Sequence, residues 1–201
     1  TIYGGHRVGI TGSCVIENGK VININYINSL NFRIARQIFG VSENILTHII
    51  DLEKNTVKNT LIASPPGCGK TTLLKDISKQ ISSGIKNIKF RGITVGIIDE
   101  RGEIAGDGMD TGNYADVISF APKSIAFEQA IRTMSPMVIA TDELGSKIDC
   151  DALINAFNCG VKIFATIHGS SIEELKRKDF MRDILENSYF ERYIVLSSKV
   201  Y

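Results

Sequence analysis

The run Ser64-Pro65-Pro66-Gly67-Cys68-Gly69-Lys70-Thr71 is the feature that most constrains the fold of this chain. It fills the eight positions of the phosphate-loop pattern G-x-x-x-x-G-K-[ST], with Ser64 in place of the first glycine. A short apolar strand is predicted over residues 60–63, and an amphipathic helix over residues 70–83. A phosphate loop needs this strand–loop–helix context, so the chain is expected to contain a nucleotide-binding α/β domain.

The residue types of the loop fit ATP and Mg²⁺. Backbone N–H groups of residues 67–72 would surround the phosphates at the positive end of the following helix. Lys70 would contact the β- and γ-phosphates, and the Thr71 hydroxyl would bind Mg²⁺. A glycine-rich turn without a ligand would not explain why this lysine and threonine follow it. The predicted nucleotide-binding residues are Ser64, Gly67, Cys68, Gly69, Lys70, Thr71 and Thr72.

Beyond residue 59, apolar strands alternate with amphipathic helices, which indicates an α/β fold with a mostly parallel sheet between two layers of helices. A glycine-rich loop over residues 102–114 interrupts the alternation and contains no arginine, unlike the lid of a small-molecule kinase. The further predicted strands are 93–99, 117–121, 137–141, 161–167 and 193–197, and the further helices are 124–134, 149–158 and 172–187.

Residues 1–50 are expected to be the remainder of a truncated N-terminal α+β domain, and residues 51–201 the ATPase domain. Strands over 7–16 and 20–26 flank Asn18-Gly19, a typical hairpin turn. Apolar residues at helical spacing predict helices over 30–39 and 42–52, the second with Ser42 as its N-cap.

Two predicted strands end in paired acids, Asp99-Glu100 and Asp142-Glu143. Since the carboxyl ends of parallel strands meet at one edge of a sheet, both pairs should face the nucleotide. Phosphoryl transfer to water needs one carboxylate near Mg²⁺ and another that orients the attacking water. We assign Asp142 to the metal, while Glu143 and Glu100 compete for the catalytic base. Either pair could instead cap a helix or form a surface ion pair.

A further predicted strand ends in His168, followed by Ser170 and Ser171, each three residues before a glutamate. That spacing predicts a capping box at the start of the next helix. His168 should therefore lie beside the same crevice. Two roles stay open for it, a γ-phosphate sensor and a structural histidine.

Composition narrows the class of partner. The formal net charge is +1, the charged residues make up 22% of the chain, and the longest basic run is Lys176-Arg177-Lys178, so no nucleic-acid partner is expected. The 4 cysteines form no C-x-x-C pair, and no apolar run is long enough to span a membrane. A cytoplasmic protein is therefore expected.

Several segments resemble the stage III sporulation protein AA family, which is similar to the RecA-like ATPases of type II secretion, type IV secretion and pilus systems. Those ATPases carry a Walker A loop, an Asp box, a Walker B segment and a His box in that order. The same order is found here at Lys70, residues 99–103, Asp142-Glu143 and His168. The Walker B segment of the secretion ATPases ends in Gly-Glu, whereas this one ends in Asp-Glu. The matching segments are 64–72, 99–105, 132–143, 159–171, 173–177 and 190–193.

The resemblance implies an ATP-hydrolysing ring, expected to be a hexamer, in the cytoplasm of the mother cell. It would lie against the membrane through partner proteins and energise the channel to the forespore. It also implies arginines at the ATP phosphates, for which the candidates are Arg33 and Arg36 on one face of the predicted helix 30–39, with Arg101 and Arg132. The alternatives are a DNA-dependent RecA-like ATPase and an ATP-binding scaffold with little turnover. The 201-residue chain alone is expected to be largely monomeric and a poor ATPase.

Overall fold

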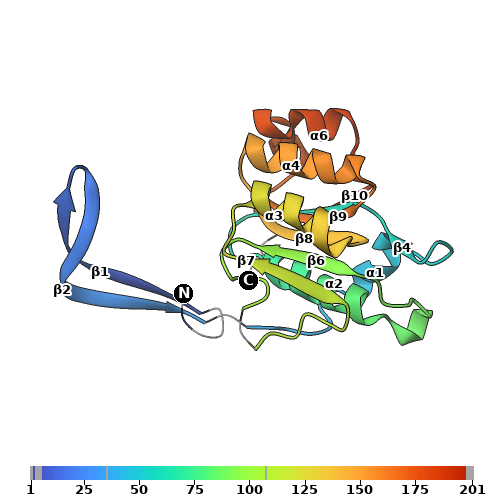
Figure 1. Ribbon diagram of the computed structural model, residues 1–201, viewed down its shortest axis with the longest axis horizontal. Helices are drawn as coiled ribbons and strands as arrows, with labels where there is room; N and C mark the ends of the chain where they lie inside the picture. The colour runs from blue at the N-terminus through green and yellow to red at the C-terminus, as the bar shows by residue number, and fades with distance from the viewer. Residues whose placement is uncertain (1, 3–5, 35, 107, 198–201) are drawn as a thin grey trace.

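The computed structural model describes residues 2, 6–34, 36–106 and 108–197. A parallel sheet covered by helices forms the body, and a long two-stranded hairpin projects from it (Figure 1). The site discussed below lies where the base of this hairpin meets the sheet.

The central sheet has six strands in the order β10-β5-β9-β8-β6-β7, and every neighbouring pair is parallel. The predicted α/β fold is thereby confirmed. Because all strands run the same way, their carboxyl ends share one edge, where ligands of such sheets bind. The strands are β5 (Thr60–Ser64), β6 (Val95–Asp99), β7 (Ala115–Ser119), β8 (Val138–Leu144), β9 (Lys162–His168) and β10 (Arg192–Val195).

Helices cover both faces of the sheet, with α3, α4 and α6 on one face and α1 and α2 on the other (Figure 1). Successive strand residues point to opposite faces, so Leu61 and Ala63 pack under α3 and α4 while Ile62 packs against α2. The continuous burial of β5 and β6 follows from this double cover. The helices are α1 (Glu43–Ile49), α2 (Lys70–Ser83), α3 (Lys123–Gln129), α4 (Lys147–Asn158), α5 (Ile172–Lys176) and α6 (Arg182–Glu186).

Two helix starts, those of α4 and α5, are capped by side chains. The Ser146 hydroxyl accepts the Asp149 N–H at the start of α4, and the Asp149 carboxylate accepts the Ser146 N–H in return. At α5 the Ser171 hydroxyl accepts the Glu174 N–H, which is one half of the predicted capping box, while the Glu174 carboxylate accepts the N–H of Ser170. Shorter helical turns complete the chain at Lys86–Ile88, Ala130–Met134 and Asp179–Met181.

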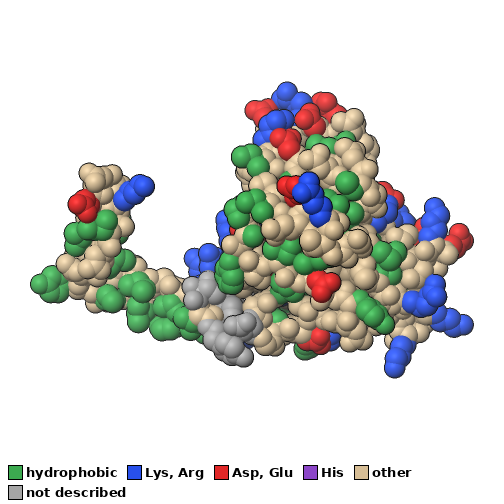
Figure 2. Space-filling view, viewed as in Figure 1, with side chains coloured by type: hydrophobic (Ala, Val, Ile, Leu, Met, Phe, Trp, Pro, Cys, Tyr) green, Lys and Arg blue, Asp and Glu red, His purple; other side chains and the backbone are tan. Residues whose placement is uncertain are grey.

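The hairpin consists of β1 (Arg7–Glu17) and β2 (Lys20–Arg33), and its turn at Asn18-Gly19 has positive φ at both residues. It is longer than predicted. Directly paired residues point to the same face of a ribbon, and the pairs Val8↔Phe32, Ile10↔Leu30, Cys14↔Ile24 and Ile16↔Val21 make one face apolar. Figure 2 shows these apolar side chains gathered along the projecting ribbon.

The predicted helix over residues 30–39 is wrong. Residues 30–33 belong to β2, and the described residues from 34 to 39 contain no helix. Leu30, Phe32 and Ile34 also fit an alternating pattern, and pairing with β1 decided in favour of the strand.

The predicted helix 42–52 ends at Ile49, since the next two residues form β3 (Ile50–Asp51), which pairs with β4 (Thr56–Val57).

Ser42 precedes α1 but does not cap it with its side chain. Its N–H and its hydroxyl both donate to the buried Asp76 carboxylate of α2, at 2.8 and 2.6 Å. The N–H of Gly40 donates to the other oxygen of Asp76 at 3.0 Å. The chain between β2 and α1, called the connector below, is therefore fixed at Gly40 and Ser42 against α2, the helix that follows the phosphate loop. A domain boundary at residue 50 stays a prediction.

Among the described residues, no helix combines the length and apolarity needed to cross a membrane.

Candidate nucleotide-binding site

The phosphate loop leaves β5 and turns directly into α2. Gly67 and Gly69 have φ angles of 77° and 88°, where side-chain-bearing residues are strained. Ser64, by contrast, is extended and pairs with His168 at the end of β9. Its position does not need the freedom of glycine, which explains why serine can stand at the first place of the motif. Cys68, which is partly exposed, and Thr72 lie on the surface of the loop with Gly67 and Gly69.

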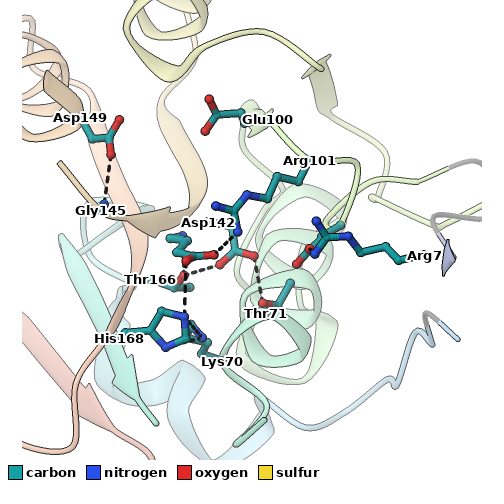
Figure 3. A network of polar contacts seen from close by, with 12 residues as sticks. Arg7, Lys70, Thr71, Glu100, Arg101, Asp142, Gly145, Asp149, Thr166 and His168 are labelled. Carbon is teal, nitrogen blue, oxygen red and sulfur yellow. Dashed lines mark hydrogen bonds and ion pairs between the residues drawn. The ribbon is translucent and has the colours of Figure 1, made fainter. Parts of the chain in front are cut away.

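Lys70 is almost buried, and its side chain lies against His168 (Figure 3). Its Nζ is 3.3 Å from Nδ1 and 3.4 Å from Nε2 of the imidazole ring. The adjacent parallel strands β5 and β9 produce this contact, because they end side by side with Ser64 opposite His168. The lysine of the loop and the predicted histidine are therefore neighbours.

Asp142, near the end of β8, joins two threonines. The Thr71 hydroxyl donates to Asp142 Oδ2 at 2.9 Å, and the Thr166 hydroxyl donates to Oδ1 (Figure 3). This places the residue assigned to the metal directly beside the threonine of the phosphate loop. Their shared role at Mg²⁺ stays a prediction.

Glu143 contacts both an arginine and the histidine of the site. Its Oε2 accepts a hydrogen bond from Arg101 Nη1 at 2.6 Å, and its Oε1 is 3.4 Å from His168 Nε2. Its backbone N–H donates to the Thr166 hydroxyl at 2.8 Å, and its φ of 49° is in the left-handed region. The carboxylate thus lies next to the histidine that contacts Lys70.

The other two predicted acids, Glu100 and Asp99, have different hydrogen-bond partners. Glu100 accepts a hydrogen bond from Lys123 Nζ at 2.6 Å, and Figure 3 shows its carboxylate directed away from the Thr71–Asp142 contact. Asp99 is buried, and its two oxygens accept the backbone N–H groups of residues 103–105. Asp99 therefore shapes the loop after β6. It also lines a small pocket together with Glu100, Asp142 and Glu143, so both acid pairs meet at this edge of the sheet.

A basic cavity of about 240 Å³ lies beside the start of α2. Arg33, the last residue of β2, and Arg36, in the connector that follows, line it, although the helix predicted to hold both does not form. Burial lowers the pKa of Lys75, and the carboxylates of Asp99, Asp142 and Glu103 oppose this shift. The remaining lining residues are Arg7, Ile34, Thr71, Thr72 and Glu103.

The fourth candidate arginine, Arg132, does not line the cavity beside α2. Arg132 is exposed, pairs with Glu128 at 2.8 Å, and lines a separate cavity of about 410 Å³ between α3 and α4. That cavity contains no residue of the phosphate loop. Within this chain Arg101, Arg33 and Arg36 are near the site and Arg132 is not.

A larger, mainly apolar cavity of about 700 Å³ borders the other side of the phosphate loop. Apolar walls with a few polar groups at one end are typical of sites for planar organic ligands. Its lining combines the connector, α1, the phosphate loop, the start of α2 and the residues after β10: Ile38, Val41, Ile45, Pro66, Gly67, Cys68, Gly69, Thr72, Leu73, Leu196 and Ser197.

The site offers Mg²⁺ the donors that it prefers. Thr71 and Asp142 provide a hydroxyl and a carboxylate oxygen 2.9 Å apart. Mg²⁺ in such sites takes one or two protein oxygens, with phosphates and waters as its other ligands. In the described part of the chain, no group of three or more His, Cys, Asp or Glu could hold a metal. The residues fit a cation that arrives with a nucleotide.

Three residues of the site were missed from the sequence: Arg7, Lys75 and Thr166. Lys75 lies one turn after Thr71 on α2, so its spacing could have revealed it. Thr166 is a polar residue inside the apolar strand β9, which is a weaker signal. Arg7, which pairs with Glu103, had no local signal, because the fold of the hairpin brings it there.

Solved structures share this fold. The ATPase DotB of Legionella pneumophila matches with a TM-score of 0.59 at 19% identity, over 86% of this chain and 46% of its own. The pilus retraction motor PilT with bound ADP matches with a TM-score of 0.57 at 14% identity, over 93% and 57%. At these identities the likeness shows a common fold.

Sequence comparison identifies closer relatives. Stage III sporulation protein AA of Bacillus subtilis (strain 168) is 42% identical over 98% of the chain, which spans 64% of that protein. The uncharacterized protein ycf45 of Cyanidium caldarium is 27% identical over 86% of the chain and 47% of its own length. The family model described as "Sporulation stage III, protein AA" matches residues 1–200. The chain belongs to this sporulation protein family.

Proposed function

We propose that this chain binds ATP with Mg²⁺ and hydrolyses it, as the ATPase part of a motor that acts during endospore formation. The observation that carries the proposal is the convergence of Lys70, Thr71, Asp142, Glu143 and His168 at one edge of the parallel sheet. A glycine loop, a mobile cation, a metal-binding oxygen pair and a second carboxylate are the parts that ATP hydrolysis requires.

The roles follow from the contacts. Lys70 exchanges its contact with His168 for the β- and γ-phosphates, and the backbone N–H groups of the loop bind the remaining phosphate oxygens. Thr71 and Asp142 hold Mg²⁺, which offsets phosphate charge when it is bound. Glu143 orients the attacking water and accepts its proton. Glu100, held by Lys123, is not used as the base.

Arginines supply positive charge for the transition state, as the resemblance to secretion ATPases implies. Arg33 and Arg36 already line the cavity next to Thr71, and Arg101 contacts Glu143. The apolar cavity on the opposite side of the loop accommodates the adenine base.

The larger assembly is also part of the proposal. The fold is shared with the ATPase DotB and with the pilus retraction motor PilT. We infer a cytoplasmic ring, a hexamer, that docks on membrane proteins of the channel between mother cell and forespore. The apolar face of the hairpin supports a contact in such an assembly, because an isolated two-stranded ribbon is marginally stable.

Phosphate release by this chain and by the longer protein tests the proposal. We expect Mg²⁺-dependent release that rises severalfold in the longer protein, and sedimentation as a monomer for the chain and as a ring for the longer protein. Release stimulated by DNA would favour a nucleic-acid motor. Nucleotide binding with no release in either form would favour an assembly scaffold. A stable, fully active hexamer from these 201 residues would contradict the expected weakness of the isolated chain.

Replacing His168 by alanine separates its two roles. We expect turnover to fall by roughly tenfold with less change in ATP affinity, because the imidazole links Lys70 to Glu143. Steady-state phosphate release and nucleotide titration measure the two effects, and His48→Ala on α1 provides a control histidine. A change in thermal stability with intact turnover would show that His168 is structural.

A further inference from the structure

Among the described residues, Thr166 is the one whose hydrogen bonds join both Asp142 and Glu143 near the end of β8. Its hydroxyl accepts the Glu143 N–H at 2.8 Å and donates its own proton to Asp142 Oδ1. One hydroxyl can donate once and accept twice, so both bonds can exist together. The side chain is fully buried in β9, which restricts it to this position.

The backbone explains why one threonine meets two residues. Between the pairs Thr141↔Ala165 and Leu144↔Ile167, two residues of β8 face one residue of β9. This is a β-bulge, and the residue opposite it is Thr166. Bulges redirect side chains at the rims of sheets, and here the bulged residues are Asp142 and Glu143.

The bulge places Glu143 in an unfavourable conformation. Its φ is 49°, in the left-handed region that residues other than glycine seldom occupy. Such a conformation persists only when surrounding contacts hold it. The bond from its N–H to Thr166 holds its backbone, while Arg101 and His168 contact its side chain.

We propose that Thr166 is a positioning residue for the hydrolysis reaction, one that fixes Asp142 and Glu143 in a single arrangement through its hydroxyl. This inference rests on the proposed ATPase function. Thr166 keeps hold of Asp142 Oδ1 whether or not Thr71 leaves Oδ2 for the metal. It thereby couples the orientation of the metal-binding carboxylate to that of the catalytic base.

The test compares Thr166→Val, which has nearly the same shape but no hydroxyl, with Thr166→Ser, which keeps it. In the ATP-hydrolysing protein we expect Thr166→Val to lower kcat by roughly tenfold to hundredfold, as for a misplaced catalytic group, with KM for ATP changed much less. Thr166→Ser should restore most of kcat. Equal loss in both variants, or wild-type kcat in Thr166→Val, would overturn the proposal.

Thr141 provides a matched control. It is a buried threonine on β8, and within the described residues its hydroxyl has no hydrogen-bond partner. Thr141→Val removes the same atom without breaking a bond and should leave kcat unchanged. A loss of kcat in Thr141→Val equal to that in Thr166→Val would attribute the effect to sheet packing.

Amide hydrogen exchange at Glu143 separates this inference from the proposed function. In Thr166→Val the Glu143 amide should exchange at least roughly tenfold faster, while Thr166→Ser keeps the wild-type rate. If wild-type protein releases no more phosphate than Lys70→Ala, the ATPase proposal fails. The exchange rates then still decide whether Thr166 holds the bulge, and an unchanged Glu143 amide in Thr166→Val would contradict it.

Discussion

Glutamine at position 143 is expected to slow phosphate release by roughly 10²-fold or more and to leave ATP binding close to wild type. Glutamine has the shape of glutamate, and its amide oxygen can still accept the hydrogen bond from Arg101. It cannot accept a proton from water at neutral pH. Binding should survive, because Lys70 and the backbone of the loop contact the phosphates. Pre-steady-state phosphate release and titration with a fluorescent ATP analogue measure the two quantities.

Glu100→Gln is the control, because Glu100 directly follows the adjacent strand β6 and carries the same functional group. Its carboxylate is bonded to Lys123, which is buried, so its loss should affect local stability more than turnover. Full activity in Glu143→Gln combined with an inactive Glu100→Gln would show that the two roles are reversed. Loss of ATP binding in Glu143→Gln would show that this acid holds the nucleotide.

The proposed site was predictable from the sequence as far as it depends on strand order and strand ends. A motif after each of three apolar strands is enough to bring Lys70, Asp142 and His168 together, because parallel strands end at one edge. The same rule places Asp99 and Glu100 at this edge, where they line one pocket with Asp142 and Glu143. The rule fixes where a strand ends, but the loop that follows decides which way each carboxylate turns. Here the backbone N–H groups of residues 103–105 donate to Asp99.

The contacts of Thr166 and Arg7 depend on features that periodicity does not contain. The bulge opposite Thr166 is a shift in register between two strands, and register emerges only when the whole sheet is assembled. Arg7 reaches Glu103 across 96 positions of sequence because the hairpin returns to the body at its base. The failed helix over residues 30–39 has a related cause. Its apolar pattern suits both periods, and the distant partner strand β1 determined the outcome.

Alanine at position 70 is expected to abolish ATP binding or to weaken it at least roughly tenfold, since a charge-assisted contact to phosphate is lost. Lys70 is the one lysine of the phosphate loop, and its Nζ already lies in the crevice beside His168. The backbone N–H groups of the loop remain in the variant, but they are neutral and cannot replace a full positive charge. Isothermal titration with ATP and Mg²⁺ measures the affinity.

Lys86→Ala distinguishes the loss of this particular cation from the loss of any lysine near α2. Lys86 is exposed just beyond the far end of α2. The 14 residues of α2, at 1.5 Å of rise per residue, separate Lys86 from the phosphate loop by about 20 Å. Its removal should leave ATP affinity unchanged. The Lys70 variant should also keep a wild-type melting curve, because the side chain ends in the crevice, outside the packed core. Folded Lys70→Ala protein with wild-type affinity for ATP would therefore refute the assignment of residues 64–71 as the phosphate loop.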